Sequence, residues 1–359
     1  MMTNDELYML RCIKLAQLGT RSVAPNPMVG AVIVHDNKII GEGYHQHYGE
    51  AHAEVNAVNS VQDKSLLKES TIFVSLEPCA HHGKTPPCSD LLIKHHFKRV
   101  VIGCLDTFSE VSGKGILKLK KAGIDVTVGV LEKECRKLNK RFFTFHEKKR
   151  PFIMLKWAQS QDGYIDLNRE NNQKGINWIT QKETKTIVHQ WRSEEHAILV
   201  GKNTIINDNP SLTVREVKGI NPIRIVIDPK NSTFNSDYNI FNQEAPTIIF
   251  NSKIEQVQDN INWIKLEDFS IKNICNQLYK LNIQSIIIEG GAYTLNQFIN
   301  SDLWDEARVL IGQPTFKTGI KAPNINITPI HSETFFEDKI HYYKNPNSKY
   351  YENPRFKYR

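Results

Sequence analysis

The feature that most constrains this fold is a pair of short segments whose side chains form a chemical unit only if the chain brings them together. His52 and Glu54 stand two residues apart in the first segment. Cys79 and Cys88 lie at the two ends of the second segment, and Cys79 directly follows Pro78. One imidazole beside two thiols is a ligand set that suits a zinc ion. The fold must therefore place two separate loops at one point.

The backbone around these residues limits where they can lie. Residues two apart on a regular helix point to nearly opposite sides, so His52 and Glu54 converge only where a helix begins. Gly49, just upstream, permits such an irregular entry. Pro78 places Cys79 after a strand end, where the ligand-binding loops of α/β sheets collect.

Three protein ligands leave the fourth tetrahedral position of zinc open for a water molecule. We therefore predict His52, Cys79 and Cys88 as ligands of Zn²⁺, and Glu54 as the catalytic residue that transfers the proton. A His-X-Glu segment joined to a strand-end Pro-Cys matches the zinc-deaminase signature. The alternative is a closed structural zinc site with a fourth ligand, which His81 or His82 would supply.

Charge argues against a surface that binds nucleic acid. The net charge is +7, and residues 344–359, with five basic residues and one acidic residue, contribute +4 of it, which leaves +3 for the other 343 residues. Basic residues of a nucleic-acid-binding protein cluster along a docking element. We read the basic tail as a solvated terminus or a last edge strand.

Several function classes are excluded by what the sequence lacks. It has no run of about 20 apolar residues, the length a membrane helix needs, and its start does not resemble a signal peptide. We therefore expect a cytoplasmic protein that does not bind membranes. The other four of the six cysteines, at 12, 104, 135 and 275, stand in helix- or strand-like segments and are expected to pack as small apolar groups.

Hydrophobic periodicity predicts two α/β domains, residues 1–147 and residues 148–359, with the boundary at a charge run and a proline near 146–151. In the first domain we expect strands at 29–34, 38–44, 71–76, 99–105 and 124–130, and helices at 5–18, 52–60, 89–96, 115–122 and 131–145. In the second we expect strands at 152–156, 197–200, 223–227, 247–250, 285–288 and 307–311, and helices at 181–192, 271–281 and 293–301. Residues 230–265 are interpreted only as variable surface structure.

The loop between the two cysteines is longer than in common zinc deaminases, which have two residues there; this one has eight. With that loop, the segments Pro25-Asn26-Pro27 and Gly49–Glu54 resemble the deaminase–reductase family of riboflavin biosynthesis. The resemblance implies a cytidine-deaminase-like three-layer domain followed by a dihydrofolate-reductase-like domain. It also implies that the Asn26 loop and Lys84-Thr85 help to hold a pyrimidine nucleotide, with Lys84 on its phosphate.

The resemblance implies two successive reactions. The first domain would hydrolytically deaminate 2,5-diamino-6-ribosylamino-4(3H)-pyrimidinone 5′-phosphate with zinc. The second would use NADPH to reduce the ribosyl group to ribityl, which gives 5-amino-6-(5-phosphoribitylamino)uracil. The expected partner is thus a small phosphorylated pyrimidine rather than a nucleic acid, and family membership suggests a homo-oligomer.

In the second half the resemblance extends through residues 156–163, 178–180, 198–204, 208–215 and 289–291. It implies that NADPH is bound by Ala158, Trp178, Thr204, Asp208, Gly291, Ala292, Tyr293, Thr294, Leu295, Asn296 and Gln297. It implies that the substrate is bound by Arg192, Leu212, Arg215 and Glu289. Free N–H groups at a helix start suit a pyrophosphate, and a guanidinium fits a phosphate with two hydrogen bonds.

The chain departs from the family pattern at Gln161, at Ile176 and over residues 107–112. The deaminase motifs are intact. Two departures lie in the reductase half, and the third lies in the loop of residues 107–112. Two other interpretations stay open. One is a zinc deaminase acting on another nucleotide or on nucleic acid, with a degenerate reductase domain. The other is a scaffold with a structural zinc. No general acid or base of the reductase half is evident from the sequence.

Overall fold

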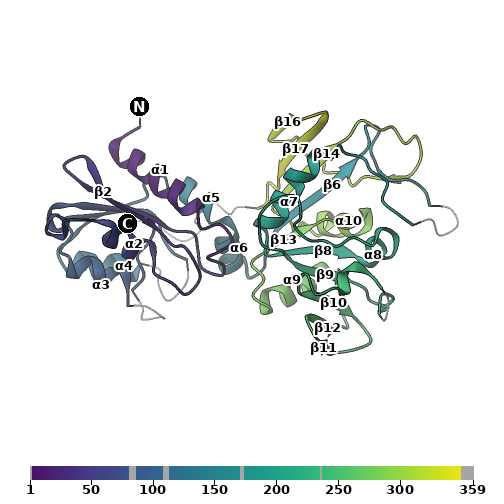
Figure 1. Ribbon diagram of the computed structural model, residues 1–359, viewed down its shortest axis with the longest axis horizontal. Coiled ribbons are helices and arrows are strands. Elements are labelled where there is room, and N and C mark those ends of the chain that lie inside the picture. The colour runs from purple at the N-terminus through teal and green to yellow at the C-terminus, as the bar shows by residue number, and fades with distance from the viewer. Residues whose placement is uncertain (1, 81–85, 108–112, 170–173, 235–236, 349–359) are drawn as a thin grey trace. The chain divides into compact units, whose positions relative to one another are not determined.

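The computed structural model describes residues 2–80, 86–107, 113–169, 174–234 and 237–348. The chain divides into two compact units with the junction between Lys148 and Lys149. Each unit contains its own sheet (Figure 1) and is described by itself.

The first unit is a five-stranded sheet with helices on both faces (Figure 1). The strand order is β2-β1-β3-β4-β5; β1 is antiparallel to both of its neighbours, whereas β3, β4 and β5 are parallel. The strands are β1 (Gly30–His35), β2 (Lys38–Tyr44), β3 (Thr71–Leu76), β4 (Arg99–Cys104) and β5 (Asp125–Val128). The helices are α1 (Asn4–Gln17), α2 (Ala53–Ser60), α3 (Cys88–Lys94), α4 (Lys114–Lys121), α5 (Glu132–Leu138) and α6 (Lys140–Lys148), with a 3₁₀ turn at Lys64–Glu69.

The strands of this sheet are apolar on both faces because helices cover both. In β1, Ala31 and Ile33 join the core beneath α2, whereas Val32 and Val34 join the core beneath α1 and α5. This is the period-two alternation of a strand, here with both sets buried. Two cores therefore hold β3 and its following loop between two helical layers, which positions Cys79.

The second unit is built on one ten-stranded sheet of order β11-β12-β10-β9-β8-β13-β6-β14-β17-β16. Its strands are β6 (Phe152–Gln159), β8 (Ala197–Gly201), β9 (Ile223–Ile227), β10 (Thr247–Asn251), β11 (Gln256–Gln258), β12 (Ile261–Lys265), β13 (Ser285–Ile288), β14 (Glu306–Ile311), β16 (His331–Phe335) and β17 (Asp338–Lys344). A separate pair joins β7 (Tyr164–Asp166) and β15 (Ile320–Lys321). The helices are α7 (Thr184–Glu194), α8 (Lys202–Asp208), α9 (Ile271–Lys280) and α10 (Ala292–Asn300), with a 3₁₀ turn at Asn239–Phe241.

The predicted elements agree with this architecture, with three differences. The helix expected over 131–145 is broken at Asn139, whose backbone leaves the helical region. Residues 230–265 are not merely variable surface structure, because they contain β12, a buried parallel strand that includes Trp263. The short strands β7, β11 and β15, the strands β16 and β17, and the short helix α8 were not predicted. Their apolar patterns are brief, and the sheet rather than the local sequence stabilises them.

The four cysteines outside the predicted site are buried thiols, as expected. Within the described residues, none of the helices has both the length and the apolar character that crossing a bilayer requires.

Candidate metal centre and reductase site

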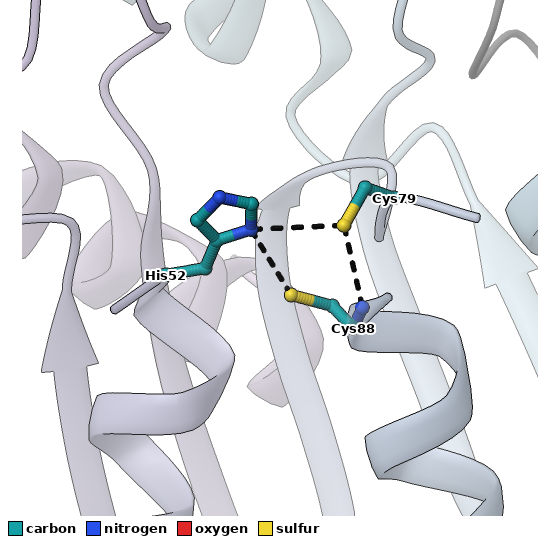
Figure 2. Close-up of side chains that lie close together, drawn as sticks. All are labelled: His52, Cys79 and Cys88. Atoms are coloured by element: carbon teal, nitrogen blue, oxygen red, sulfur yellow. Dashed lines mark hydrogen bonds between the residues drawn. The ribbon is translucent and has the colours of Figure 1, made fainter. Parts of the chain in front are cut away.

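His52, Cys79 and Cys88 converge at one point of the first unit (Figure 2). The His52 Nδ1 atom lies 3.2 Å from Cys88 Sγ and 3.6 Å from Cys79 Sγ. His52 is the residue that precedes α2, Cys79 lies in the loop after β3, and Cys88 is the first residue of α3. The helix-start geometry expected for His52 is present, with φ −72° and ψ 166°, and Gly49 upstream has φ 85°.

These distances fit a tetrahedral zinc ion. Bonds of about 2.3 Å to sulfur and about 2.0 Å to nitrogen separate the ligand atoms of such a site by roughly 3.5–3.8 Å. Two helix starts and the end of a strand carry the three side chains, so each lies next to a regular element. Among the residues that the structure describes, they are the group whose ligand atoms all lie within 4.8 Å of one another.

The two thiols ionise unequally. The pKa of Cys79 is lowered to about 4, because its thiolate accepts a hydrogen bond from the Cys88 thiol and lies beside His52. The Cys88 N–H also points at Cys79 Sγ at 3.3 Å. The pKa of Cys88 is raised because the neighbouring Cys79 and burial both oppose a second negative charge. A divalent cation bound here would remove this conflict, because it would favour the ionised form of both thiols.

Glu54 lies in the first turn of α2 and its side chain is buried, with 3% of its surface exposed. Burial raises the pKa of Glu54 to about 7, although the nearby His52 opposes that rise. A carboxyl group whose pKa lies near neutrality is suited to take up and release a proton. Glu54 therefore has the position and the acidity expected of a proton-transferring residue.

Four of the segments named in the sequence predictions lie wholly or mostly outside the part of the chain that the structure describes. His81 and His82, the alternative fourth ligands, and the Lys84-Thr85 pair lie outside the described residues, as do residues 108–112 of the loop that departs from the family pattern. Most of the basic tail, residues 349–359, lies outside them too.

Glu77, which precedes Pro78 and Cys79, was not predicted as a site residue. It connects the cysteine segment to the start of α4. Its carboxylate is buried and accepts hydrogen bonds from the N–H groups of Asp106, Gly113, Gly115 and Ile116, at 3.0–3.4 Å. It thereby ties the start of α4 to the segment that leads to Cys79. The signal in the sequence is an acidic residue between an apolar strand and Pro-Cys, a position where charge is otherwise out of place.

In the second unit, two of the four predicted substrate residues, Arg192 and Glu289, form an ion pair. Arg192 donates two hydrogen bonds to Glu289, at 2.7 and 2.8 Å. Lys156 Nζ lies 3.4 Å from the same carboxylate. Leu212 is buried close by, and the carbonyl of the next residue, Thr213, accepts a hydrogen bond from Arg192. Arg192 is thus an ion-pair partner of Glu289, which the sequence did not indicate.

Arg215, the fourth predicted substrate residue, lies next to this cluster and is exposed. Its N–H donates to His189 Nδ1 at 2.9 Å, and its guanidinium donates to Thr213 Oγ1 at 2.6 Å. Burial, together with the cations Arg192 and Arg215, lowers the pKa of His189 to about 4. This region is therefore positively charged, because Arg192, Arg215 and Lys156 outnumber the single carboxylate of Glu289.

Two groups of predicted cofactor residues, Thr204 and residues 291–297, follow the carboxyl ends of β8 and β13. Gly201 precedes α8 and Gly291 precedes α10. The two helix starts approach so closely that a Cβ atom on Gly201 would lie 2.6 Å from Thr294 Oγ1, and one on Gly290 would lie 2.9 Å from the Gly201 nitrogen. A Cβ on Gly291 would be 4.0 Å from Thr204 Oγ1. A Cβ at Gly201 or Gly290 would crowd this approach, whereas Gly291 has room for one. The approach brings the N–H groups of the two helix starts near one another.

The other predicted cofactor residues differ in their burial and in their contacts. Trp178 is 58% exposed, with Lys185 Nζ 3.6 Å from its ring centroid. Ala158 lies at the end of β6, opposite Leu310 of β14. Asp208 pairs with Arg169 at 2.7 Å, so its carboxylate is already engaged. Leu295 is fully buried in the core, so it offers a cofactor only its main chain.

Two departures from the family pattern leave the local structure intact. Gln161 belongs to a turn that Asp162 closes by accepting hydrogen bonds from Ser160, Phe316 and Lys317, which lower the pKa of Asp162 to about 2. Ile176 is 46% exposed and leaves its position open to solvent.

We expect Glu289→Gln to destabilise the second unit. Removing the carboxylate leaves Arg192 and Lys156 as uncompensated buried cations, and breaking such a pair costs about 3–5 kcal/mol. All five tryptophans lie after residue 150, so urea unfolding followed by tryptophan fluorescence reports on this unit alone. The exposed Glu216→Gln is the matched control. A free energy of unfolding that changes as little as in the control would contradict the ion-pair assignment.

Comparison with known proteins covers both units. Residues 151–330 match the family model of the RibD C-terminal domain, and residues 2–104 match that of the cytidine and deoxycytidylate deaminase zinc-binding region. The riboflavin biosynthesis protein RibD of Aquifex aeolicus is 40% identical over 332 residues, which cover 91% of this chain and 92% of that protein. RibD of Escherichia coli is 36% identical and covers 86% of this chain and 87% of that protein.

Solved structures are also similar to this chain over most of its length. A crystal structure from Thermotoga maritima, described as a diaminohydroxyphosphoribosylaminopyrimidine deaminase/5-amino-6-(5-phosphoribosylamino)uracil reductase, is 36% identical with a TM-score of 0.86, and the match covers 95% of this chain and 99% of that one. RibD of Acinetobacter baumannii is 29% identical with a TM-score of 0.84 over 94% of this chain and 98% of that one.

These matches confirm the predicted fold class, a cytidine-deaminase-like first domain followed by a dihydrofolate-reductase-like second domain. They also confirm the resemblance on which the cofactor predictions rest, a zinc-binding deaminase domain and an NADPH-using reductase domain. The chain belongs to the RibD family of riboflavin biosynthesis proteins.

Proposed function

We propose that this chain catalyses two successive steps of riboflavin biosynthesis. The first domain, residues 1–147, hydrolyses the amino group from 2,5-diamino-6-ribosylamino-4(3H)-pyrimidinone 5′-phosphate. The second, residues 148–359, reduces the ribosyl group of the product to ribityl with NADPH. The observation that carries the proposal is the convergence of His52, Cys79 and Cys88 beside the buried Glu54. The division of the described chain at Lys148 supports the domain assignment.

In the deaminase domain, His52, Cys79 and Cys88 would hold the zinc ion, which when bound would lower the pKa of a water molecule. Glu54 would accept a proton from the attacking water as its oxygen bonds to the amino-bearing ring carbon, and would donate that proton to the amine as the carbon–nitrogen bond breaks and ammonia leaves. Its burial keeps the carboxyl group away from bulk solvent, which would otherwise exchange the proton. The three ligands leave one position open, as a catalytic site requires.

In the reductase domain, the starts of α8 and α10 would receive the pyrophosphate of NADPH, through the N–H groups of residues 291–294 and through Thr204. Trp178 and Ala158 border the cofactor. Asp208, at the end of α8, contributes to the same NADPH site. Arg215, whose guanidinium is exposed, binds the substrate phosphate. Arg192, Leu212 and Glu289 line the ribosyl part, where Arg192 holds the Glu289 carboxylate in place.

The finer aspects of the proposal concern partners and location. The protein acts on a small phosphorylated pyrimidine and not on nucleic acid, which the small net charge of residues 1–343 supports. It works in the cytoplasm, which the six unpaired cysteines support, since disulfides are rare there. It forms a homo-oligomer, as inferred from family membership.

The reductase assignment has a direct test. Purified protein is mixed with NADPH and the deaminated substrate, and the nicotinamide absorbance is followed. The proposal predicts loss of absorbance that depends on the substrate. If NADPH is not consumed while the diamino compound still releases ammonia, the chain is a deaminase with an inactive second domain.

We expect NADPH to quench the tryptophan fluorescence of the free protein, because the exposed Trp178 borders its site. In Trp178→Phe, NADPH should quench the fluorescence of the other tryptophans less than it quenches the unaltered protein. The Kd for NADPH should rise by about tenfold, because roughly one good stacking contact is lost. Trp263→Phe is the control, since Trp263 is buried in another part of the unit. Unaltered quenching in Trp178→Phe would place the cofactor elsewhere.

A further inference from the structure

A buried asparagine far from the metal ligands in sequence holds the loop that faces them. Asn139 is 3% exposed and stands where α5 ends. Its side-chain oxygen accepts a hydrogen bond from the Met28 N–H at 2.8 Å, and its Nδ2 donates to the Met28 carbonyl at 2.8 Å. One amide side chain thus satisfies both main-chain groups of one residue, as a neighbouring strand would.

Met28 ends the loop that carries Asn26. The Asn26 N–H donates to the Val23 carbonyl at 2.8 Å, and the Val29 carbonyl accepts from the N–H of His45 at 3.0 Å. The loop is therefore fixed before and after Met28. With both of its main-chain groups held by Asn139, Met28 sets where the Asn26 side chain lies.

The hydrogen bonds of His45 determine how the Asn26 amide is turned. His45 Nδ1 lies 3.0 Å from the Ala51 carbonyl, which only accepts, so Nδ1 carries the proton. In the neutral ring Nε2 is then an acceptor, and it lies 3.1 Å from Asn26 Nδ2, which donates to it. Asn26 Oδ1 is consequently directed away from His45 and available to an N–H donor.

This arrangement lies beside the metal cluster. The rings of His45 and His52 are edge to face, with centroids 5.4 Å apart, and Ala51, the partner of His45, directly precedes His52. A continuous set of contacts therefore runs from Asn139 through Met28, Asn26 and His45 to the ligand-bearing segment.

We propose that Asn139 is a positioning residue of the deaminase reaction, which acts through the Met28 main chain to hold the Asn26 amide in the orientation that accepts an N–H group of the pyrimidine substrate. This inference rests on the proposed deaminase function.

The expected effect of Asn139→Ala is on KM rather than kcat. Without the two hydrogen bonds the loop samples other conformations, and the apparent affinity falls in proportion to the fraction that stays competent. Bound substrate selects the competent loop again, so turnover at saturation is restored. We expect KM for the diamino substrate to rise by about tenfold and kcat to fall by less than about threefold, which corresponds to the loss of about 1.4 kcal/mol.

Three further variants separate positioning from general damage. Asn139→Asp keeps the acceptor for the Met28 N–H but loses the donor, so its KM should rise as well. Val101→Ala makes a cavity in the core of the same unit and should lower stability without raising KM. In the double variant of Asn26→Ala and Asn139→Ala, KM should not exceed that of Asn26→Ala alone, because Asn139 acts through Asn26.

Amide hydrogen exchange of residues 20–28 gives a readout independent of activity. Exchange should be faster in Asn139→Ala and unaltered in Val101→Ala. An unchanged KM in Asn139→Ala, or effects of the two asparagines that multiply, would overturn the proposal. If the unaltered protein itself releases no ammonia from the diamino compound, the deaminase function fails instead, and that result is distinct because it precedes any substitution. NADPH-dependent reduction of the deaminated substrate should be the same in every variant.

Discussion

Replacing Glu54 by Gln is expected to abolish deamination while zinc stays bound and NADPH-dependent reduction persists. The carboxyl group of Glu54 is the buried acid beside the metal ligands, and burial raises its pKa to about 7. An amide of the same shape neither accepts nor releases a proton, and loss of a positioned general acid–base group lowers rates by about 10²–10⁴-fold. Ammonia release from the diamino substrate is the measurement, with zinc determined on the same sample.

The control for this variant is Glu50→Gln, an exposed acidic residue two positions before His52, which should leave ammonia release unaffected. If Glu54→Gln loses its zinc, Glu54 is a ligand and not a proton carrier. If it keeps both zinc and full activity, another group transfers the proton and the assignment is wrong.

The second large effect is expected for Cys88→Ser, which should lose both zinc and deamination. Cys88 Sγ lies 3.2 Å from His52 Nδ1 and supplies one of only two thiolates. A serine hydroxyl is shorter, stays protonated and is a weak zinc ligand, whereas zinc deprotonates a coordinating thiol. Zinc per chain after dialysis should fall from near one to near zero, and reduction of the deaminated substrate should continue.

Cys12→Ser is the matched control, because a hydroxyl there keeps the hydrogen bond that the Cys12 thiol donates to the Phe73 carbonyl. It should retain zinc and activity. Stoichiometric zinc in Cys88→Ser would contradict the ligand set and would mean that a histidine of the cysteine loop, His81 or His82, binds the metal.

The metal centre could be predicted from the sequence because each part of it has a local cause. The start of α2 at Ala53, the positive φ of Gly49 and the end of β3 before Pro78 are encoded within a few residues of His52 and Cys79. Zinc chemistry then requires these residues to meet. The burial of Glu54 could be anticipated only in part, since it depends on how α2 packs on the sheet.

What the sequence did not reveal are contacts between distant segments. The bond between Arg192 and Glu289 joins α7 to the end of β13, and nothing near either residue indicates its partner. The break at Asn139 lies within a pattern that favours one continuous helix, and the Asn139 side chain bonds to Met28, which is distant in sequence. β12 and β17 form because the sheet has edges to pair with, which local propensity does not report.

The central claim, that one chain performs both reactions in order, is tested most directly by the stoichiometry of a single incubation. Zinc-loaded protein is given the diamino substrate and NADPH, and ammonia and oxidised cofactor are measured together. The account predicts equal amounts of the two, with ammonia released first, and no NADPH oxidation once a chelator has removed the zinc. Ammonia without NADPH oxidation, or NADPH oxidation that persists on the diamino substrate after the zinc has been removed, would contradict it.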